Sequence, residues 1–352
     1  MKMIHCADIH LGSKIDSIFS KEISDKKKQE IRSTFKKMVD YANDNNITVI
    51  LLSGDIFDSD NPYKKDKDFF YSVIKSNPHI DFLYLHGNHD LQSNYDEEID
   101  NLKQFSNNWK SYKYDNVTVS GIELSKENYS SLYSTLTLNK NDLNIVMMHG
   151  QIGHIESVND INISKLKNKN IDYLALGHIH KHSFDKIDDR GIYVYSGCLE
   201  GRGFDEIGEK GFVILDITDK ITFKFVPFSE RNILIEEVDI TNLKDAYQVY
   251  NKIKNEIHFK YKNIYRIILK GSIDFDVDSL TSDVEKYLEK ECAFVDVKDN
   301  TNKRIDLSVF ENDLSLRGEF VRSVMNNVNY SKEDKLKIIN YGLKALSGKE
   351  ID

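Results

Sequence analysis

Five short apolar runs in the first half of the chain each end in a polar motif. The runs cover about residues 3–7, 47–53, 80–86, 144–148 and 171–176. They are rich in Val, Ile and Leu, as strands covered on both faces of a sheet usually are. A helical stretch with one apolar stripe, at about residues 21–45, separates the first two runs. This alternation predicts a layered α/β domain, in which ligands gather at the carboxyl ends of the strands.

The polar motifs carry carboxylate, imidazole and amide side chains, which are ligands for divalent cations. In chain order they are Asp8-Ile9-His10, Gly54-Asp55-Ile56-Phe57-Asp58, Gly87-Asn88-His89-Asp90, His149-Gly150 and Gly177-His178-Ile179-His180. One such motif alone would be a weak sign of metal binding. Because all five stand at strand ends, they predict that residues far apart in the sequence share one cleft and hold two adjacent metal ions.

The predicted ligands divide into two sets that meet at one bridging carboxylate. The first ion would take Asp8, His10 and His180, and the second would take Asn88, His149 and His178. Asp55 stands on a tight turn opened by Gly54, and its two oxygens can bind both cations. Mixed oxygen and imidazole donors suit Mn²⁺, Fe²⁺ or Zn²⁺ better than Ca²⁺ or Mg²⁺.

Two such ions, about 3.5–4 Å apart, polarise a bridging hydroxide and bind the phosphate oxygens of an in-line displacement. Their residual positive charge favours an anionic phosphate ester and its transition state. His89 is left beside Asn88 as an imidazole that is not a ligand. We expect His89 to protonate the leaving oxygen or stabilise the transition state, with Asp90 orienting its ring. The motifs therefore predict a two-metal phosphoesterase.

Further short stretches give a narrower pattern. They are Ala7-Asp8-Ile9-His10-Leu11-Gly12, Tyr195-Ser196-Gly197, Gly201-Arg202, Glu206, Gly208 and Glu209-Lys210-Gly211-Phe212. Together with the five motifs, they resemble the calcineurin-like metallophosphoesterase superfamily over about residues 1–230. Within that superfamily, the chain most resembles the bacterial SbcD and YhaO type of DNA repair exonuclease, relatives of the eukaryotic double-strand-break repair nuclease.

The resemblance implies a β-sandwich flanked by helices and metal-dependent cleavage of DNA phosphodiesters, typically with Mn²⁺. It also implies a homodimer in complex with an SMC-like ATPase of the SbcC type. Archaeal and eukaryotic relatives often carry His where Asp58 stands, so Asp58 is expected to support the site from behind the ligands. Protein phosphatases of the superfamily carry Arg-Gly after this Asp, whereas Ser59-Asp60 follows here, which counts against protein phosphatase activity.

The second half of the chain lacks these motifs and predicts two further parts after the nuclease domain of residues 1–230. Residues 231–302 alternate strand, helix, strand, helix and strand, which predicts a small α+β domain. Residues 303–352 predict two amphipathic helices, the second with Ser331 and Asp334 as a capping box. By resemblance, the α+β part would be a cap that narrows substrate access. The tail would dock on the ATPase or, equally, pack on its own cap.

Composition adds limits on location and binding. The formal net charge is −9, and no basic stripe is obvious, so we expect weak DNA affinity for the isolated chain. The sequence shows no apolar signal segment and no run long enough to span a bilayer. These features favour the cytoplasm, in association with the nucleoid and without a membrane. Three widely separated cysteines make a disulfide framework improbable.

Three function classes stay open. The first is a DNA exonuclease or endonuclease subunit, and the second is a phosphodiesterase for cyclic nucleotides or other small esters. The third is a non-catalytic scaffold for DNA ends, which is disfavoured because every predicted ligand and His89 are present. Other histidines have simpler interpretations. His5 and His86 lie within strands and are expected to be core groups, and His154 and His182 are not expected to bind metal.

Overall fold

The structure is a computed structural model of residues 1–352, and it describes all of them except 16, 91–97, 154–158, 274–278, 304–306 and 347–352. The chain divides into two compact units, Met1–Ile233 and Leu234–Asp352, each of which is described by itself. Both mix helices and strands, so the predicted α/β class is confirmed. The finer predicted boundaries at residues 230 and 302 stay predictions.

The first unit contains two six-stranded sheets. The first sheet has the order β14-β13-β1-β2-β3-β4, in which β1 to β4 run parallel, β13 is antiparallel to β1, and β14 is antiparallel to β13. The strands of this sheet are β1 (Lys2–Cys6), β2 (Val49–Ser53), β3 (Asp81–Leu85), β4 (Leu102–Gln104), β13 (Gly211–Ile217) and β14 (Ile221–Pro227).

The second sheet has the order β11-β12-β10-β7-β6-β5, with a parallel centre and antiparallel edge strands β5 and β11. Its strands are β5 (Lys110–Tyr114), β6 (Val117–Gly121), β7 (Leu143–His149), β10 (Tyr173–Gly177), β11 (Ser183–Lys186) and β12 (Ile192–Tyr195). A small pair, β8 (Gln151–Ile152) and β9 (Asp160–Ile161), follows β7. All five predicted runs are strands of these two sheets, which confirms that part of the prediction.

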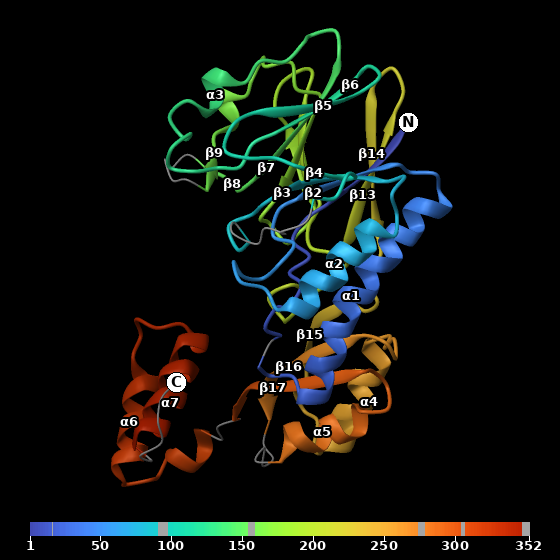
Figure 1. Ribbon diagram of the computed structural model, residues 1–352. Coiled ribbons are helices and arrows are strands. Elements are labelled where there is room, and N and C mark those ends of the chain that lie inside the picture. The colour runs from blue at the N-terminus through green and yellow to red at the C-terminus, as the bar shows by residue number, and fades with distance from the viewer. Residues whose placement is uncertain (16, 91–97, 154–158, 274–278, 304–306, 347–352) are drawn as a thin grey trace. The chain divides into compact units, whose positions relative to one another are not determined.

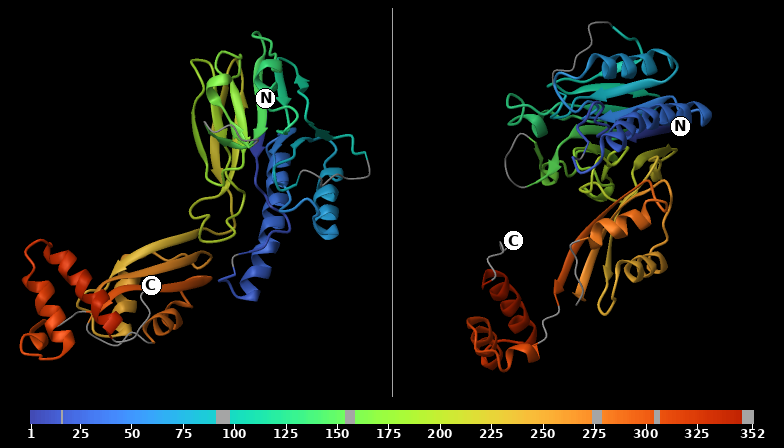
Figure 2. Two further views of the ribbon diagram at one scale, coloured as in Figure 1. Left: turned by 90° about the vertical axis from the view of Figure 1, so that its left-hand side faces the viewer. Right: turned by 90° about the horizontal axis from the view of Figure 1, so that it is seen from below.

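The two sheets pack face to face, and helices cover the outer face of the first (Figures 1 and 2). Fully buried Leu51 of β2 and Ile145 of β7 belong to the core between the sheets. On the other face of the first sheet, Phe35 of α1 (Lys21–Asp44) and Phe70 of α2 (Lys64–Lys75) are also fully buried. The short α3 (Leu132–Thr135) contributes to a core on the far side of the second sheet. The central strands are therefore covered on both faces, as their composition predicts.

Helix α1 shows why the local sequence folds as expected. The Ser20 side chain accepts a hydrogen bond of 3.3 Å from the Ile23 N–H and caps the first turn. The apolar stripe predicted from the sequence is buried against the first sheet, where it includes Ile31, Phe35, Met38 and Ala42. Capping and burial of one stripe together fix where the helix begins and which way it faces.

The second unit follows the predicted order of strand, helix, strand, helix and strand. Its elements are β15 (Ile233–Asp239), α4 (Ala246–Glu256), β16 (Ile264–Ile273), α5 (Leu280–Leu288) and β17 (Phe294–Lys303), then a 3-10 helix (Leu307–Phe310), α6 (Leu316–Asn326) and α7 (Lys332–Leu346). The strands form one sheet in the order β15-β16-β17. The Ser331 hydroxyl accepts a hydrogen bond of 3.1 Å from the Asp334 N–H, which confirms the predicted cap of α7.

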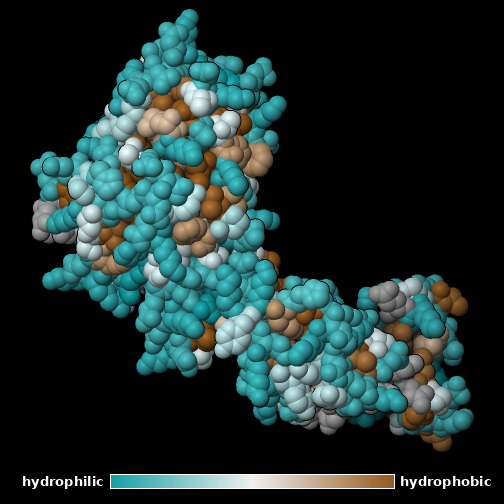
Figure 3. All heavy atoms as spheres, turned by 90° about the vertical axis from the view of Figure 1, so that its right-hand side faces the viewer, coloured by the Kyte–Doolittle hydropathy of each residue, from teal (hydrophilic) through white to brown (hydrophobic). Residues whose placement is uncertain are grey.

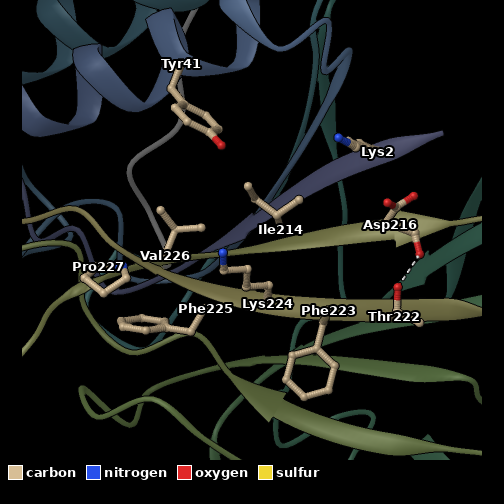
Figure 4. Close-up of a pocket in the computed structure, with 10 residues that line it drawn as sticks. All are labelled: Lys2, Tyr41, Ile214, Asp216, Thr222, Phe223, Lys224, Phe225, Val226 and Pro227. Atoms are coloured by element: carbon tan, nitrogen blue, oxygen red, sulfur yellow. Dashed lines mark hydrogen bonds between the residues drawn. The ribbon is translucent and has the colours of Figure 1, made fainter.

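The molecular face in Figure 3 is dominated by hydrophilic residues, which fits a chain with 30% charged residues. Within the described part of the chain, no helix is both long and apolar enough to cross a membrane. A hollow of about 450 Å³ lies on the β13–β14 hairpin, below Tyr41 of α1 (Figure 4). None of the residues that line it belongs to the predicted site, so this hollow plays no part in the predicted chemistry.

We expect Phe70→Ala to destabilise the first unit by about 3–5 kcal/mol, because it removes a fully buried ring and leaves a cavity. The ring contacts Phe35, Phe57 and Tyr84, with centroids 5.4–5.8 Å away. Urea unfolding followed by the fluorescence of Trp109, the only tryptophan, measures the change. The control is Phe184→Ala at a ring that is 58% exposed, and an equal loss in both variants would contradict the prediction.

Candidate metal centre

The five motifs stand at the carboxyl ends of five strands, three in one sheet and two in the other. Asp8, Asp55 and Asn88 follow β1, β2 and β3, respectively, while His149 ends β7 and His178 follows β10. Parallel strands present their carboxyl ends at the same edge of a sheet, and the two sheets face each other. The fold therefore gathers residues far apart in the sequence, such as Asp8 and His178, which are separated by 170 positions.

Backbone hydrogen bonds hold these strand ends together. The Asp8 N–H donates to the Gly54 carbonyl at 3.0 Å, so the loops after β1 and β2 run side by side. The His178 N–H donates to the Asp8 carboxylate at 2.9 Å and links the two sheets. Four site residues have positive φ, a conformation that costs energy for residues with a side chain. They are Asp8 (53°), His10 (54°), Asp55 (52°) and His178 (97°).

Gly54 is required by this close packing. Its φ is 92°, and a Cβ atom built on it would lie 2.2 Å from the Nδ1 atom of His149. A larger residue would displace the His149 ring and strain the backbone at the same time. The glycine that opens this motif thus lets the loop after β2 approach the end of β7.

The first cluster comprises Asp8, His10 and His180, whose nearest ligand atoms lie within 4.8 Å of one another. The Nε2 atoms of His10 and His180 are only 3.1 Å apart. Two neutral lone pairs at this distance repel unless a proton or a cation lies between them. The separation is close to the distance of about 3.3 Å expected between neighbouring ligands of a tetrahedral ion bound at about 2.0 Å. The three side chains therefore fit a shared cation.

The second cluster comprises Asp55, His149 and His178, and Asn88 joins it. The Asn88 Oδ1 atom lies 3.1 Å from the Nε2 atom of His149 and 2.9 Å from the Nδ1 atom of His178. The Nδ1 atom of His149 lies 2.9 Å from the carbonyl of Ser53. Because that carbonyl can only accept, Nδ1 carries the proton of the neutral ring and Nε2 is left free for a cation.

Asp55 lies between the two clusters. Its Oδ2 atom is 3.4 Å from the Nε2 atom of His149 and 3.9 Å from that of His10. Its Oδ1 atom accepts a hydrogen bond of 2.9 Å from the His89 N–H. The structure thus brings all seven predicted ligands together in the two predicted sets, with Asp55 where a bridging carboxylate would stand. That these residues bind metal ions stays a prediction.

The buried site perturbs its titratable groups in opposite directions. Burial raises the pKa of the Asp8 carboxyl to about 6 and lowers the pKa of the His10 ring to about 4. Burial opposes charge on His149 as well, but the hydrogen bond and charge of Asp55 outweigh it and raise the His149 pKa to about 9. A cation that binds at the second cluster must displace this proton, so metal uptake there weakens as pH falls.

The three residues predicted to assist catalysis occupy different environments. His89 is exposed, and its ring centroid lies 5.4 Å from that of His10. Asp58 has its Oδ1 atom 3.0 Å from the Nδ1 atom of His10, behind the ring. Asp90 is fully buried. The exposed imidazole stands where a substrate could reach it, while the Asp58 side chain is 25% exposed and Asp90 lies inside the protein.

Asp90 links two loops of the site. Its Oδ2 atom accepts hydrogen bonds from the Ile56 N–H at 2.8 Å and the Tyr84 hydroxyl at 2.8 Å. Its Oδ1 atom accepts a bond of 2.7 Å from the Gly87 N–H. Asp90 therefore fixes the Asp55 loop against the Asn88 loop, a role that sequence reasoning missed. The orientation of the His89 ring by Asp90 stays a prediction.

Sequence reasoning also missed Glu206, although the stretch that contains it contributes to the family resemblance. The Oε1 atom of Glu206 lies 2.6 Å from the Nδ1 atom of His180. The remaining histidines follow their simpler interpretations where the structure describes them. His5 is fully buried against the Tyr173 hydroxyl, 2.9 Å away, and His86 is buried beside Glu123. His182 stacks on Phe225, and His154 lies outside the described residues.

We expect Asp90→Asn to destabilise the first unit by about 2–3 kcal/mol, because an amide NH₂ would face backbone donors and the charge-assisted bonds would be lost. Urea unfolding monitored at Trp109 measures this effect. Asp40→Asn serves as the control, because the exposed pair of Asp40 with Lys36 on α1 contributes less than about 1 kcal/mol. A wild-type unfolding midpoint for Asp90→Asn would contradict the loop-linking role.

The sequence of this chain is similar to those of several known proteins. DNA double-strand break repair protein Mre11 from Sulfolobus acidocaldarius is 22% identical and aligns over 97% of this chain and 94% of its own. The Mre11 protein of Sulfurisphaera tokodaii is 25% identical, with coverage of 77% and 73%. Uncharacterized metallophosphoesterase YhaO from Bacillus subtilis is 24% identical, with coverage of 77% and 72%. The predicted resemblance is thereby confirmed.

The family model for calcineurin-like phosphoesterases matches residues 1–182, a segment that contains all five motifs and more than half of the 352 residues. Members of this family use two divalent metal ions, and the two clusters described above offer suitable donors. The chain belongs to the calcineurin-like phosphoesterase family, and it is a metal-dependent phosphoesterase.

Proposed function

We propose that this protein is a two-metal DNA nuclease. The observation that carries the proposal is the pair of ligand clusters that meet at Asp55. Hydrolysis of a phosphodiester requires two bound cations, an attacking water and a proton donor, and the protein has to hold them in place. Relatives named as DNA double-strand break repair proteins, aligned over most of this chain, support DNA as the source of the phosphodiester.

The proposed roles follow from the positions of the side chains. Two Mn²⁺ ions, when bound, would polarise the attacking water and bind phosphate oxygens. The first ion would lie among Asp8, His10 and His180, and the second among Asn88, His149 and His178, with Asp55 between them. Asp55 and Asn88 are themselves held by the loops that Asp90 links. The chain thus supplies preformed positions for the reacting groups.

His89 is the proposed proton donor to the leaving oxygen. Its backbone N–H is held by the Asp55 carboxylate at 2.9 Å, while its side chain is exposed beside the first cluster. An exposed imidazole within hydrogen-bond reach of a leaving oxygen can act as its general acid. Asp58 is proposed to act through His10, because it faces the Nδ1 atom of that ring at 3.0 Å.

A partner fits the charge and the surface of the chain. A net charge of −9 gives the chain little affinity of its own for a polyanion. Near α6 and α7, the side chains of Leu314 and Val328 are 96% and 91% exposed, which supports a docking role for this segment. We propose an SMC-like ATPase of the SbcC type as the partner, in a homodimeric assembly associated with the nucleoid in the cytoplasm.

The reaction is tested by incubating end-labelled duplex and single-stranded DNA, and separately a small aryl phosphodiester, with the protein and Mn²⁺ or Mg²⁺. We expect Mn²⁺-dependent DNA cleavage, which increases when the partner ATPase is added and disappears with a chelator. Hydrolysis of the small ester without DNA cleavage, even in the presence of the partner, would favour the alternative of a small-molecule or cyclic-nucleotide phosphodiesterase.

His89→Ala is expected to lower the turnover number about 10²–10⁴-fold, because it removes the proton donor and leaves every ligand in place. Its stoichiometry of bound Mn²⁺, measured by equilibrium dialysis, should equal that of the wild type. His258→Ala, at an exposed histidine of the second unit, is the matched control and should retain full turnover. Full activity of His89→Ala would remove His89 from the proposed role.

A further inference from the structure

Two carboxylates lie behind the two histidines of the first cluster. The Oε1 atom of Glu206 is 2.6 Å from the Nδ1 atom of His180, and the Oδ1 atom of Asp58 is 3.0 Å from the Nδ1 atom of His10. On both rings, Nδ1 faces a carboxylate while Nε2 faces the cluster. Each carboxylate favours the tautomer with its proton on Nδ1, which leaves the lone pair of Nε2 for a cation.

Arg202 joins these two carboxylates. Its Nη1 atom donates to the Oδ1 atom of Asp58 at 2.9 Å, and its Nη2 atom donates to the Oε1 atom of Glu206 at 2.6 Å. The Nε atom adds a second bond to Glu206 at 3.0 Å, and the backbone N–H adds a third at 2.7 Å. We call Asp58, Arg202 and Glu206 the carboxylate bridge. With His10 and His180 it forms a closed ring of contacts that includes two of the three residues of the first cluster.

The carboxylate bridge is largely shielded from water. The side chain of Glu206 is 3% exposed, and that of Arg202 is 18% exposed. A guanidinium that is already bonded to two carboxylates has few donors left for a substrate phosphate. Its planar fork can bind both carboxylates at fixed angles, which a single ammonium group cannot do. These contacts favour a role in placing ligands over direct contact with substrate.

The second cluster has no equivalent of the carboxylate bridge among the described contacts of its histidines. The Nδ1 atom of His149 faces the neutral carbonyl of Ser53, and the Nδ1 atom of His178 faces Asn88. An imidazole whose N–H faces a carboxylate binds a cation more strongly than one whose N–H faces a carbonyl, because the carboxylate makes the ring more basic. The two halves of the site are therefore supported in different ways.

We propose that Arg202 and Glu206 are positioning residues that fix the rings of His10 and His180 and thereby set the cation affinity of the first cluster alone. Glu206 would act directly on His180. Arg202 would act on His10 through Asp58 and on His180 through Glu206, and its Nη2 atom also lies 3.2 Å from the Nδ1 atom of His180. This inference rests on the proposed function, because it takes the first cluster to be a metal site. Under this inference, Arg202 and Glu206, which lie outside the five motifs, cause the difference in cation affinity between the two clusters.

The test separates the two sites. In a His149→Ala background the second cluster is broken and the first is measured, whereas in a His10→Ala background the second cluster is measured. Mn²⁺ binding to the metal-free protein is followed by equilibrium dialysis and by the loss of the free-Mn²⁺ signal in electron paramagnetic resonance. Glu206→Gln should weaken binding about 10–100-fold in the first background and leave it unchanged in the second.

Arg202→Lys should have the same selective effect, because a lysine keeps the positive charge but loses the two-sided contact. The matched control is Arg190→Lys, which alters a similar two-bond pair with Asp172 at 3.0 and 2.8 Å, outside the clusters. This control should leave both affinities unchanged. Urea unfolding monitored at Trp109 checks that each variant is folded. If Arg202→Lys does not fold, Arg202→Met is the second variant.

Wild-type affinity of the first cluster in folded Glu206→Gln and Arg202→Lys proteins would overturn the inference. An equal loss at both clusters would also overturn it, because it would indicate a general structural role. Failure of the wild-type chain to bind two Mn²⁺ ions would reject the proposed metal site itself and the inference with it. Two bound ions without DNA cleavage would reject only the proposed substrate.

Discussion

The contact between the two sheets is the constraint on which the site depends. Leu51 of β2 and Ile145 of β7 are fully buried in the core between the sheets, and that core sets the distance from the Asp55 loop to His149. Two polar contacts complete the junction at its edge, His149 Nδ1 to the Ser53 carbonyl and the His178 N–H to Asp8. A shift of one sheet by a single residue would break both clusters, because each contains residues from both sheets.

The site stores energy that the surrounding fold must offset. Asp8, His10, Asp55 and His178 all have positive φ, and Asp8 and Asp55 place carboxylates in a buried setting. Residues in such conformations persist only where neighbours overdetermine them. Here backbone bonds between the loops after β1 and β2 and the bond from the His178 N–H to Asp8 do so. The rigid sandwich therefore lets the chain hold strained ligands in place before any cation arrives.

The fold and the ligand set could be predicted because each depends on local sequence. Asp8 and His10 follow an apolar run whose length and composition already indicate a buried strand. The supporting residues could not be predicted in this way, because their partners are distant. Glu206 lies 26 positions from His180, and Arg202 lies 144 positions from Asp58. Only the packing of the loop after β12 against the first cluster reveals that these side chains meet.

Charge explains why the groups that cleave a phosphodiester and the surface that binds DNA would be different parts of the assembly. In the two clusters the chain supplies only carboxylates, imidazoles and one amide, so most of the positive charge that attracts a phosphodiester must come from bound cations. With the proposed cations bound, attraction is local, and the net charge of −9 adds none at longer range. A polymer such as DNA must therefore be held by another surface. The proposed ATPase could provide it, whereas a small ester would need no such surface.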